Sequence, residues 1–541
     1  MSTAQNGATL LVHSLEANGV DTCYALPGEE TIALMDALAS SSIALVLCRH
    51  EQGAAFMASV HARLTGKPVA CLATLGPGAT NLVTGLADAT LDLAPVIAVT
   101  GQGARNRLGQ GRNSHQVVDL EALFEPVTLY SRRLMMSGEI SGAVAEALRI
   151  AQGDAPGAVH LSLPEDLADA EAPGEPVVLP LSHAGLAPAD AIAAATDALD
   201  RAERPIVLAG AGVLRAGAVE PLRRFLDRTQ LPLATSFMAK GILPSDAAAQ
   251  IGTFGLPVED HIDGAIAEAD LIFAVGLDPV EYSPAKLTDH GRIPVIAVSA
   301  RVPPADVGWQ LAASLVGDVE HSLEELTRAL NGRTWSLWPQ AVEARDALRE
   351  DRAKHRLGAT QSPASDGALV AALEAALAPS DIVLSGVGTH KLSIARTLAP
   401  QAPGQVLIAN GLAGMGLALP GAIAAAQLYP ERRVIAVCGD GDVMMNVQEM
   451  ETATRLGVSV TVVVWLDGGY GLIEQKHQSQ TGDDTDLSFA STEWDHLARA
   501  FHWRFTACEN AGALEQALTQ AKPGDTPHLI TVPVRYDGSL T

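Results

Sequence analysis

Two aspartates of this chain each follow a short apolar run that is typical of a buried strand. Asp440 stands in the turn Gly439-Asp440-Gly441-Asp442 after residues 434–438, and Asp467 comes 27 residues later, directly after residues 460–466. The carboxyl ends of neighbouring parallel strands meet at one edge of a sheet, so we expect the two carboxylates to lie close together. Because Mg²⁺ prefers oxygen ligands and commonly takes carboxylates together with phosphate oxygens, the pair predicts a site for Mg²⁺ and a diphosphate. A single Gly-Asp-Gly would more often be a plain turn.

The elements that must hold these aspartates alternate in character along the chain. Short apolar runs are separated by Ala- and Leu-rich amphipathic stretches, which is typical of strand and helix units in parallel sheets. We therefore expect an α/β fold with three doubly wound parallel-sheet domains, at residues 1–175, 185–335 and 362–541, joined by the Pro-rich residues 173–188 and the Arg-rich residues 335–361. The pattern also predicts a helix at residues 443–456 and strands at residues 43–48, 69–74, 95–100, 206–208, 271–275, 294–298, 382–384, 434–438, 460–466 and 528–532.

The charge of the chain argues against two classes of partner. Lys and Arg number 36 and Asp and Glu 62, so the net charge of −26 would repel nucleic acids and anionic membranes. The uncharged stretches 68–87 and 397–430 are interrupted by Gly, Pro and Asn, so neither is expected to cross a membrane. Residues 1–7 show no secretory signal, and the five cysteines are scattered. We therefore expect a cytoplasmic protein with reduced thiols.

A second glycine-rich turn, Gly210-Ala211-Gly212, follows the apolar run 206–208. It opens like a dinucleotide-binding fingerprint, but the final glycine and the acidic residue about 20 positions further on are missing. We therefore interpret it as a tight turn between a strand and a helix.

The Asp440 turn and the Gly-Gly-Tyr-Gly that begins after Asp467 together resemble the cofactor motif of thiamine-diphosphate-dependent enzymes. Further matches to this family follow in order along the whole chain: Leu26-Pro27-Gly28, the segment 49–58, residues 76–81 and residues 411–420. Within the family, the sequence is most similar to acetolactate synthases of the catabolic type. Asp467, His115-Gln116 and residues 276–284 carry that similarity.

The resemblance assigns catalytic roles to particular residues. Glu51 would place a proton on the aminopyrimidine ring of the cofactor, and Met415 would hold the cofactor in its bent form. Gln116 would hold the acceptor carbonyl, with His115 and Gln52 as further candidates. Taken alone, Glu51 would more often be a plain acid in a first helical turn, and only the diphosphate motif beside it favours the catalytic role; Met415 could be ordinary core packing.

The resemblance also implies the cofactors. Thiamine diphosphate and Mg²⁺ are expected, and Asp440 and Asp467 would bind the metal through their side chains and Gly469 through its carbonyl oxygen. FAD is expected to be absent, because residues 278–282 lack the Arg- and Asp-rich character of the flavin-binding synthases. The residues implied to contact the organic cofactor are Pro27, Gly28, Gly388, Thr389, His390, Ala413, Met415, Gly439, Asp440, Gly441, Asp442, Tyr470 and Gly471.

The implied reaction is decarboxylation of a 2-oxo acid and joining of the remaining fragment to a second carbonyl, which for an acetolactate synthase means two molecules of pyruvate. Two departures from the family bear on the substrate: Leu129 stands where a Lys is common, and residues 474–477 stand where relatives often have a Trp. A decarboxylase or a benzaldehyde-lyase-like carboligase therefore stays open, as do a catalytically inactive scaffold and a Rossmann dehydrogenase. The resemblance implies a homodimer at least, and a homotetramer as the further expectation.

Overall fold

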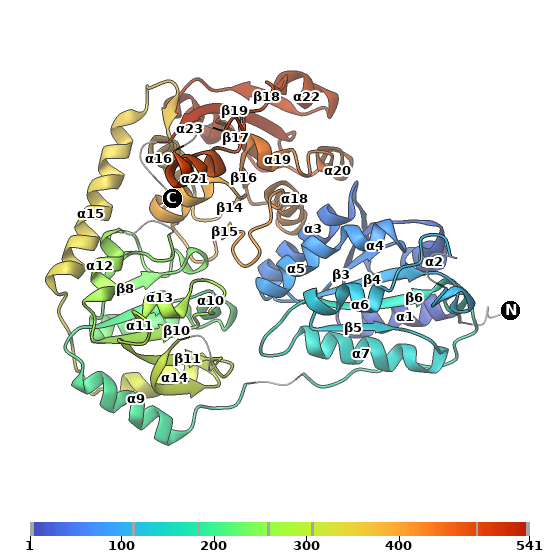
Figure 1. Ribbon diagram of the computed structural model, residues 1–541, viewed down its shortest axis with the longest axis horizontal. Helices are drawn as coiled ribbons and strands as arrows, with labels where there is room; N and C mark the ends of the chain where they lie inside the picture. The colour runs from blue at the N-terminus through green and yellow to red at the C-terminus, as the bar shows by residue number, and fades with distance from the viewer. Residues whose placement is uncertain are drawn as a thin grey trace. The chain divides into compact units, whose positions relative to one another are not determined.

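The structure is a computed structural model that describes residues 5–110, 114–181, 184–256, 260–304, 308–482 and 485–536. Three sheets lie in these ranges, and their strands pair in parallel, with helices between most successive strands (Figure 1). Parallel strands need crossover connections, which the amphipathic stretches of the sequence supply. The predicted α/β fold with three parallel sheets is confirmed.

The first sheet has the strand order β2-β1-β3-β4-β6-β5. Its strands are β1 (Thr22–Leu26), β2 (Ala44–Leu47), β3 (Val69–Ala73), β4 (Val96–Gln102), β5 (Tyr130–Arg133) and β6 (Val159–Pro164). Its helices are α1 (Gly7–Ala17), η1 (Glu29–Thr31), α2 (Ile32–Ala39), α3 (Glu51–Thr65), α4 (Pro77–Asn81), α5 (Val83–Leu91), η2 (Arg105–Arg107), α6 (Leu120–Phe124), η4 (Glu125–Val127), η5 (Ser137–Glu139), α7 (Ile140–Ala151) and α8 (Glu165–Ala168). Every residue of β3, β4 and β6 is buried, which explains why these strands are continuous apolar runs in the sequence.

Two later segments of the chain, residues 411–430 and 444–459, form one compact unit with residues up to 183. They contribute α18 (Ala418–Leu428) and α20 (Glu449–Leu456), and α18 packs against α3. The prediction of one helix over residues 443–456 was wrong, because α20 begins only at Glu449. Asn446 lies in the turn before it, with its side chain buried and bonded to a backbone carbonyl, and asparagine favours such turns over a helix interior.

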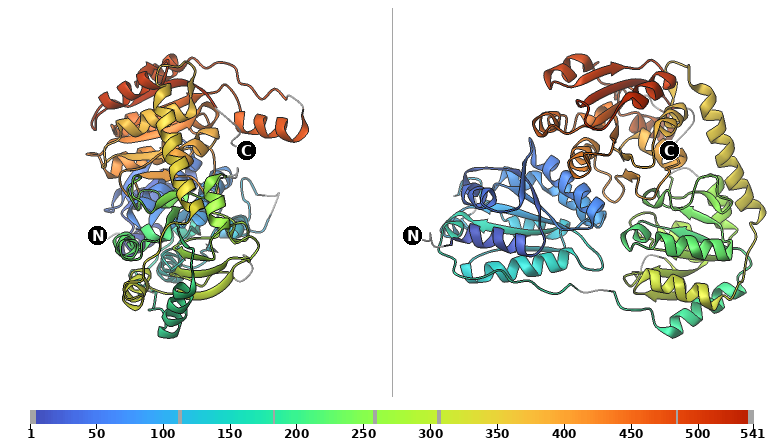
Figure 2. Two further views of the ribbon diagram at one scale, coloured as in Figure 1. Left: turned by 90° about the vertical axis from the view of Figure 1, so that its left-hand side faces the viewer. Right: turned by 180° about the vertical axis from the view of Figure 1, so that it is seen from behind.

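The second sheet has the strand order β12-β11-β10-β7-β8-β9. Its strands are β7 (Pro205–Ala209), β8 (Leu233–Thr235), β9 (Gln250–Thr253), β10 (Leu271–Val275), β11 (Pro294–Ser299) and β12 (Gln310–Val316). The helices are α9 (Ala189–Arg201), α10 (Gly212–Arg215), α11 (Val219–Thr229), η6 (Phe237–Ala239), α12 (His261–Ala267), α13 (Pro284–Leu287), α14 (Val319–Ala329), α15 (Pro339–His355) and η7 (Arg356–Gly358). The long helix α15 contacts α12 and also α16 of the third sheet, and Figure 2 shows it running along both.

The third sheet follows the path β13-β19-β17-β16-β14-β15, with β18 beside β19. Its strands are β13 (Ala364–Ser365), β14 (Ile382–Ser385), β15 (Val406–Ile408), β16 (Val434–Gly439), β17 (Thr461–Leu466), β18 (Arg504–Ala507) and β19 (His528–Arg535). The helices are α16 (Asp366–Ala376), α17 (Thr389–Thr397), α19 (Asp440–Val443), α21 (Gly471–Thr481), α22 (Trp494–Ala500) and α23 (Ala511–Gln520). Together with the second sheet this sheet forms the other compact unit.

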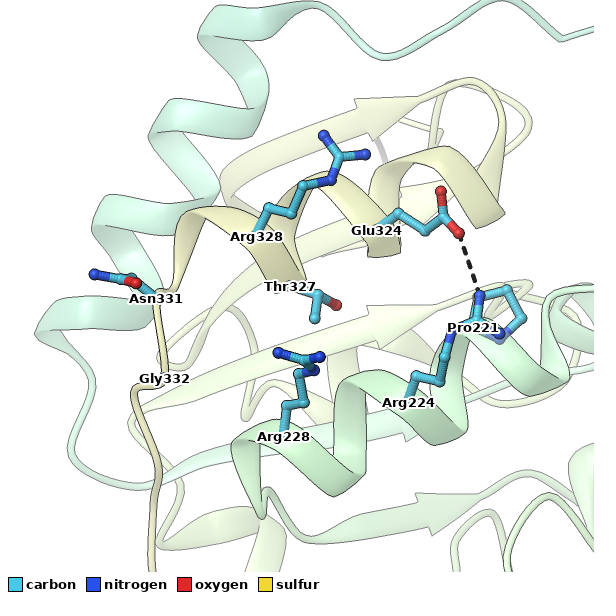
Figure 3. A pocket seen from close by; sticks show the side chains of 8 residues that line it. All are labelled: Pro221, Arg224, Arg228, Glu324, Thr327, Arg328, Asn331 and Gly332. Atoms are coloured by element: carbon cyan, nitrogen blue, oxygen red, sulfur yellow. Dashed lines mark hydrogen bonds and ion pairs between the residues drawn. The ribbon is translucent and has the colours of Figure 1, made fainter.

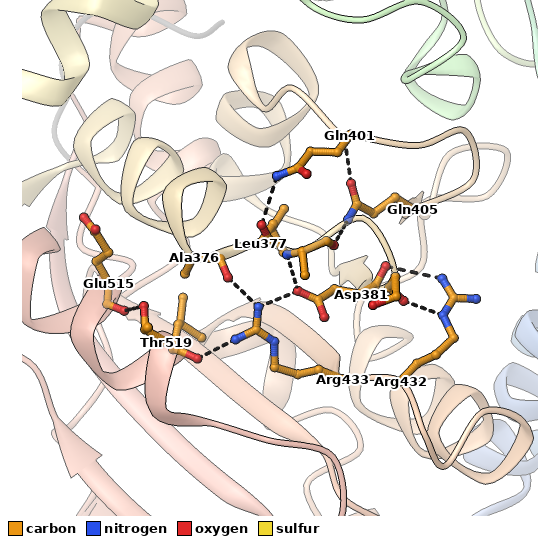
Figure 4. Close-up of polar contacts among 12 residues, drawn as sticks. Ala376, Leu377, Asp381, Gln401, Gln405, Arg432, Arg433, Glu515 and Thr519 are labelled. Atoms are coloured by element: carbon orange, nitrogen blue, oxygen red, sulfur yellow. Dashed lines mark hydrogen bonds and ion pairs between the residues drawn. The ribbon is translucent and has the colours of Figure 1, made fainter.

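The start of β16 is fixed by an arginine whose side chain is only 11% exposed. Arg433 forms an ion pair with Asp381 and donates to the carbonyl oxygens of Ala376 and, at 2.6 Å, Leu518 (Figure 4). These partners come from the ends of α16 and α23 and from the residue before β14. The guanidinium therefore ties the start of the strand that leads to Asp440 to Asp381 and to the ends of α16 and α23, two helices that pack against each other.

The strands predicted from apolar runs are confirmed as β2, β3, β4, β7, β10, β11, β14, β16, β17 and β19, with boundaries shifted by a few residues. The strands β1, β5, β6, β8, β9, β12, β13, β15 and β18 were not predicted. The strands β8, β13 and β15 have only two or three residues, and β5, β9, β12 and β18 are partly exposed. In the buried strands β1 and β6, polar residues (Thr22, and His160 with Ser162) break the continuous apolar run of a central strand.

Candidate functional site

The structure brings Asp440 and Asp467 together at the carboxyl ends of β16 and β17, which pair directly in the sheet. The Asp440 carboxylate accepts hydrogen bonds from Gly441 N at 2.8 Å and from Gly468 N at 2.9 Å. Asp467 is exposed as a residue, but its carboxyl group is partly buried. This burial, followed by the charge of Asp440, raises the pKa of Asp467 to about 7. Two carboxylates that repel each other in this way are a fitting donor set for a divalent cation.

The predicted metal site would need further ligands in addition to its two acidic side chains. Among the described residues, no group of three or more His, Cys, Asp and Glu side chains could hold a metal ion. The expected set of Asp440, Asp467 and the Gly469 carbonyl fits this finding, because Mg²⁺ completes its coordination with phosphate oxygens and water. A Cβ added to Gly469 would approach Leu487 O to 2.8 Å, so the turn is built for glycine at that position.

A second turn, at the start of α17, contributes Gly388, Thr389 and His390. The His390 ring is buried, and its Nε2 has no hydrogen-bond partner in the part of the chain that the structure describes. Burial, followed by the charge of Lys391, lowers the pKa of His390 to about 3, so the ring is neutral. A Cβ on Gly388 would approach His390 Nδ1 to 3.0 Å, and one on Gly439 would approach it to 3.4 Å. The imidazole therefore fills the space between the two glycine turns.

Asp442 has a different environment from the other two aspartates. It is buried, and its Oδ1 accepts a hydrogen bond from Val387 N at 3.1 Å. A Cβ added to Gly386 would fall 1.8 Å from Asp442 Oδ2. Asp442 thus fixes the backbone that leads into Gly388, which is a supporting role for the turn where the diphosphate is expected.

Tyr470 and Gly471 line the same edge of the sheet. The Tyr470 ring, 40% exposed, lies edge-on to Phe489 with the ring centres 4.7 Å apart. A Cβ on Gly471 would come within 2.8 Å of Asp467 Oδ2, and one on Gly441 within 3.0 Å of the Phe489 ring. The glycines therefore leave the space that the Asp467 carboxylate and the two rings occupy.

Glu51 is the first residue of α3 and is 5% exposed. Its Oε2 accepts a hydrogen bond from Asn81 Nδ2 at 2.9 Å, and a Cβ added to Gly78 would lie 3.1 Å from its Oε1. The preceding residue, His50, caps the helix through its Nδ1, which accepts from Gln52 N at 3.0 Å. The side chain of Glu51 is thus oriented by α4, while one of its oxygens is left for a ligand.

Pro27 and Gly28 follow directly after the strand β1, and Gly28 lies next to Thr74. The N–H of Gly28 donates to Thr31 Oγ1 at 3.0 Å, and a Cβ at Gly28 would approach the Thr74 side chain to 2.5 Å. Thr74 in turn donates to Glu30 Oε2 at 2.7 Å. This close packing requires a glycine at position 28.

Gln116 has a positive φ of 57°, and its side chain is exposed. A Cβ at Gly76, just before α4, would approach Gln116 O to 2.6 Å. His115 is exposed as well, and its carbonyl accepts from Arg107. The structure therefore places this predicted acceptor-binding segment against the start of the helix that carries Asn81.

Ala413 and Met415 lie in an irregular loop before α18. Ala413 adopts a φ of +55°, and Gly416 a φ of +90°. The buried Asn446 donates from its Nδ2 to Gly416 O at 3.0 Å. Met415 is half-buried, and a Cβ on its neighbour Gly414 would lie 3.3 Å from the Phe56 ring. The loop is therefore fixed on both sides of Met415.

The predicted residues fall into two sets, one in each compact unit. Glu51, Pro27, Gly28, Gln116, Ala413 and Met415 belong to the first, and those around Asp440, Asp467 and His390 belong to the second. Sequence reasoning missed the buried Glu449 and Asn446, and it gave Asn81 no role. Their partners are distant in the chain, and no pattern around them signals a buried polar contact.

A surface groove of about 620 Å³ between α11 and α14 contains none of the predicted residues. Arg224, Arg228 and Arg328 line it together with Thr327 and Asn331 (Figure 3). Arg224 pairs with Glu324, while Arg228 and Arg328 stand in the last turns of their helices, where cations are favourable. These contacts account for the arginines as part of the surface of the helices.

Comparison with known families agrees with this geometry. Models of the thiamine pyrophosphate enzymes match the chain in three places: the N-terminal TPP binding domain at residues 5–123, the central domain at residues 192–326, and the C-terminal TPP binding domain at residues 386–532. The chain belongs to the family of thiamine pyrophosphate enzymes.

Relatives within this family are similar over nearly their whole length. A catabolic acetolactate synthase of Raoultella terrigena is 33% identical over 98% of this chain and 95% of its own. An acetolactate synthase of Bacillus subtilis is 31% identical over 99% of this chain and 94% of its own. The large subunit of acetolactate synthase isozyme 2 of Escherichia coli is 32% identical, over 98% and 95%. Among the described residues, no helix is both long and apolar enough to span a membrane.

Proposed function

We propose that this chain is an acetolactate synthase that uses thiamine diphosphate and Mg²⁺ to convert two molecules of pyruvate into 2-acetolactate and CO₂. The observation that carries the proposal is similarity to acetolactate synthases over nearly the full chain, with Glu51, Asp440 and Asp467 all present. In this proposal residues 1–175 bind the pyrimidine part of the cofactor, residues 185–335 form the central domain, and residues 362–541 bind the diphosphate and the metal.

The residues of the third sheet would hold the charged end of the cofactor. The N-terminus of α17, with Gly388 and Thr389, offers backbone N–H groups and a positive helix end to phosphate oxygens. Asp440 and Asp467 would share Mg²⁺ with the Gly469 carbonyl, and the cation would relieve the repulsion between the two carboxylates. Asp442 would keep the backbone of the phosphate-binding turn in place.

Glu51 would exchange a proton with the aminopyrimidine ring of the cofactor. Its Oε2 is engaged by Asn81, so Oε1 is the atom that would hold or deliver a proton to the cofactor ring. Met415 would support the bent cofactor from a loop that Asn446 fixes. Bound thiamine diphosphate supplies the electron sink that decarboxylation of a 2-oxo acid requires, while the protein supplies orientation and electrostatics.

We propose that no flavin binds to the central domain, because a carboxylate takes the place that a pyrophosphate would need. Glu281 is half-buried, and its oxygens accept hydrogen bonds from Ala211 N at 3.0 and 3.1 Å and from Asp278 N at 3.0 Å. A Cβ at Gly210 would lie 2.5 Å from Glu281 Oε1. Nucleotide-binding turns offer these backbone N–H groups to phosphates, and here they are already used. This contact also supports the plain-turn interpretation of residues 210–212.

We propose a homodimer or homotetramer, on the family resemblance, and a cytoplasmic protein. All five cysteines are buried and free, which agrees with a reducing compartment. No nucleic-acid partner is expected for a chain with a net charge of −26.

The proposal is tested by incubating the purified protein with pyruvate, thiamine diphosphate and Mg²⁺ in the absence of FAD. CO₂, 2-acetolactate and acetaldehyde are then quantified. We expect equal amounts of CO₂ and 2-acetolactate, each half of the pyruvate consumed, and no gain when FAD is added. CO₂ with acetaldehyde would instead indicate a decarboxylase. Absence of turnover with bound cofactor would indicate that Leu129 or residues 474–477 have redirected the substrate pocket.

A further inference from the structure

Glu449, the first residue of α20, is a fully buried acid that the proposed reaction does not yet use. Its side chain is 0% exposed. It lies in the same compact unit as Glu51, although the two are about 400 residues apart in the sequence. Buried acids are costly unless their oxygens are hydrogen-bonded, so the partners of this carboxylate indicate what it does.

The partners of Glu449 are the backbone groups directly before Glu51. Glu449 Oε1 accepts from Arg49 N at 3.1 Å and from His50 N at 3.0 Å, and Oε2 accepts from Arg49 N at 3.3 Å. The hydroxyl of Thr452, one turn further along α20, donates to Oε2 at 2.6 Å. Because Glu51 is the first residue of α3, these bonds determine where that helix begins.

The packing around the carboxylate leaves it little freedom. A Cβ added to Gly53 would come within 2.5 Å of Glu449 Oε1, so the first turn of α3 closes directly over it. A negative carboxylate at the N-terminus of a helix is also favoured by the helix dipole. The acid therefore acts on the start of α3 through geometry and through charge.

We propose that Glu449 is a positioning residue for Glu51, and this inference rests on the proposed function. Glu449 fixes the backbone from which Glu51 emerges, while Asn81 fixes the end of its side chain. Together the two contacts hold the Glu51 carboxyl group at one place and angle. A catalytic group that is misplaced by about 1 Å can lose on the order of 100-fold in rate.

The variants Glu449→Ala and Glu449→Gln separate the contributions of geometry and charge. Gln keeps an oxygen for the two backbone N–H groups and can donate to Thr452, whereas Ala removes every bond. We expect Glu449→Ala to lower kcat by roughly 100-fold with little change in KM for pyruvate, and Glu449→Gln to lose less than about 10-fold. The matched controls are Glu451→Ala and Glu451→Gln on the same helix, since Glu451 forms its ion pair with Arg455 within α20 itself.

A double-mutant cycle with Glu51→Gln tests whether Glu449 acts through Glu51. If it does, Glu449→Ala will cost little further turnover when Glu51 is already replaced, because the two effects will not add. A purely structural role predicts that the loss in the Glu51→Gln background is as large as in the wild type. That additive result would overturn the proposal.

Amide hydrogen exchange of the cofactor-free protein gives a readout that does not depend on turnover. We expect faster exchange in peptides covering residues 49–54 in Glu449→Ala, and wild-type exchange in the Glu451 variants. Unchanged exchange at the start of α3 would overturn the proposal even if turnover falls. If the wild type makes no 2-acetolactate, the proposed function fails, while the exchange data still decide whether Glu449 fixes this helix. Should Glu449→Ala not fold, Thr452→Val offers a smaller change with the same expected direction in both measurements.

Discussion

The two carboxylate sites of this molecule are built in opposite ways. Glu51 accepts a hydrogen bond from one neutral donor, the Asn81 amide, and Asn81 and the fixed start of α3 determine its orientation. Asp440 and Asp467 instead lie close together, and burial of the Asp467 carboxyl group, followed by the charge of Asp440, raises the pKa of Asp467. The first arrangement suits one carboxyl group that must hand over a proton, and the second suits a pair that must bind a cation. The two kinds of site should therefore fail in different ways when they are changed.

The largest loss is expected from removal of the metal. A chelator should abolish turnover, and added Mg²⁺ should restore it. Asp467→Asn should raise the Mg²⁺ concentration for half-maximal activity by at least about 100-fold, because even partners that only support a ligand are worth 10- to 100-fold in affinity. A Mg²⁺ titration of activity checks this. The control Asp486→Asn removes an exposed acid that accepts hydrogen bonds from Ser488, and a similar shift there would contradict the assignment.

Replacement of Glu51 is expected to affect turnover and not the metal. Glu51→Gln keeps the contact with Asn81 possible but removes the acid, and loss of a proton-transferring group costs roughly 10²- to 10⁴-fold in rate. Steady-state kinetics at saturating Mg²⁺ measure the fall in kcat, and the titration above should give an unchanged half-saturation value. Activity close to the wild type would rule out the proposed role.

The ion pair between Arg433 and Asp381, at the start of the strand that leads to Asp440, should contribute to the stability of the fold. Arg433→Met leaves Asp381 as a buried and unpaired acid, which typically costs about 3–5 kcal/mol (Figure 4). Denaturant unfolding followed by tryptophan fluorescence measures this loss. The control Arg499→Met breaks an exposed pair with Asp495 and should cost no more than about 1 kcal/mol. Equal losses in the two variants would show that Arg433 is not an anchor.

The loop that carries Met415 offers a smaller test in the first unit. Asn446→Ala leaves the carbonyl of Gly416 without its amide donor, a loss of about 1–3 kcal/mol, so we expect kcat to fall by roughly 10-fold. The Mg²⁺ half-saturation value should not change. Gln448→Ala is a milder comparison, because it removes the donor to Asn446 Oδ1 but keeps the Asn446 amide that donates to Gly416 O, so its loss of kcat should be smaller. A change in Mg²⁺ affinity without a fall in kcat would contradict this prediction, because it would show that the loop acts on the metal site of Asp440 and Asp467.

The smallest effect is expected at the far end of α17. Lys240 is buried and donates to Ala395 O at 2.7 Å and to Thr253 Oγ1 at 3.0 Å. Burial, followed by the charge of Arg352, lowers the pKa of Lys240 from 10.5 to about 7. The unfolded chain therefore binds more protons between pH 7 and 10.5, and the folded state loses stability as the pH falls through this window.

Lys240→Met removes that penalty. Relative to the wild type, its Tm should rise most near pH 7 and converge with the wild-type value as the pH approaches 10. Thermal unfolding of both proteins across this range measures the difference. A difference that grows with pH would have the wrong sign for a lysine with a lowered pKa.

Apolar runs and turn residues were enough to predict the central strands β14, β16, β17 and β19 of the third sheet, and with them the neighbourhood of Asp440 and Asp467, but not the central strands β1 and β6 of the first sheet. The runs 434–438 and 460–466 correspond to β16 and β17, and parallel pairing then fixes where the aspartates meet. The roles of Glu449 and Asn446 could not be predicted in this way. Each bonds to backbone groups that are 30 to 400 residues distant in the sequence, and only the packing of α3, α18 and α20 brings these groups together. The helix boundary at Glu449 was missed for the same reason.

The most direct test of the account compares wild type, Glu51→Gln and Asp467→Asn in a single assay of 2-acetolactate formation against Mg²⁺ concentration. We predict one 2-acetolactate for each CO₂ in the wild type, a lowered maximum at unchanged half-saturation for Glu51→Gln, and a large rise in half-saturation for Asp467→Asn. Both variants shifting the same quantity, or a wild type that forms no 2-acetolactate, would contradict the account.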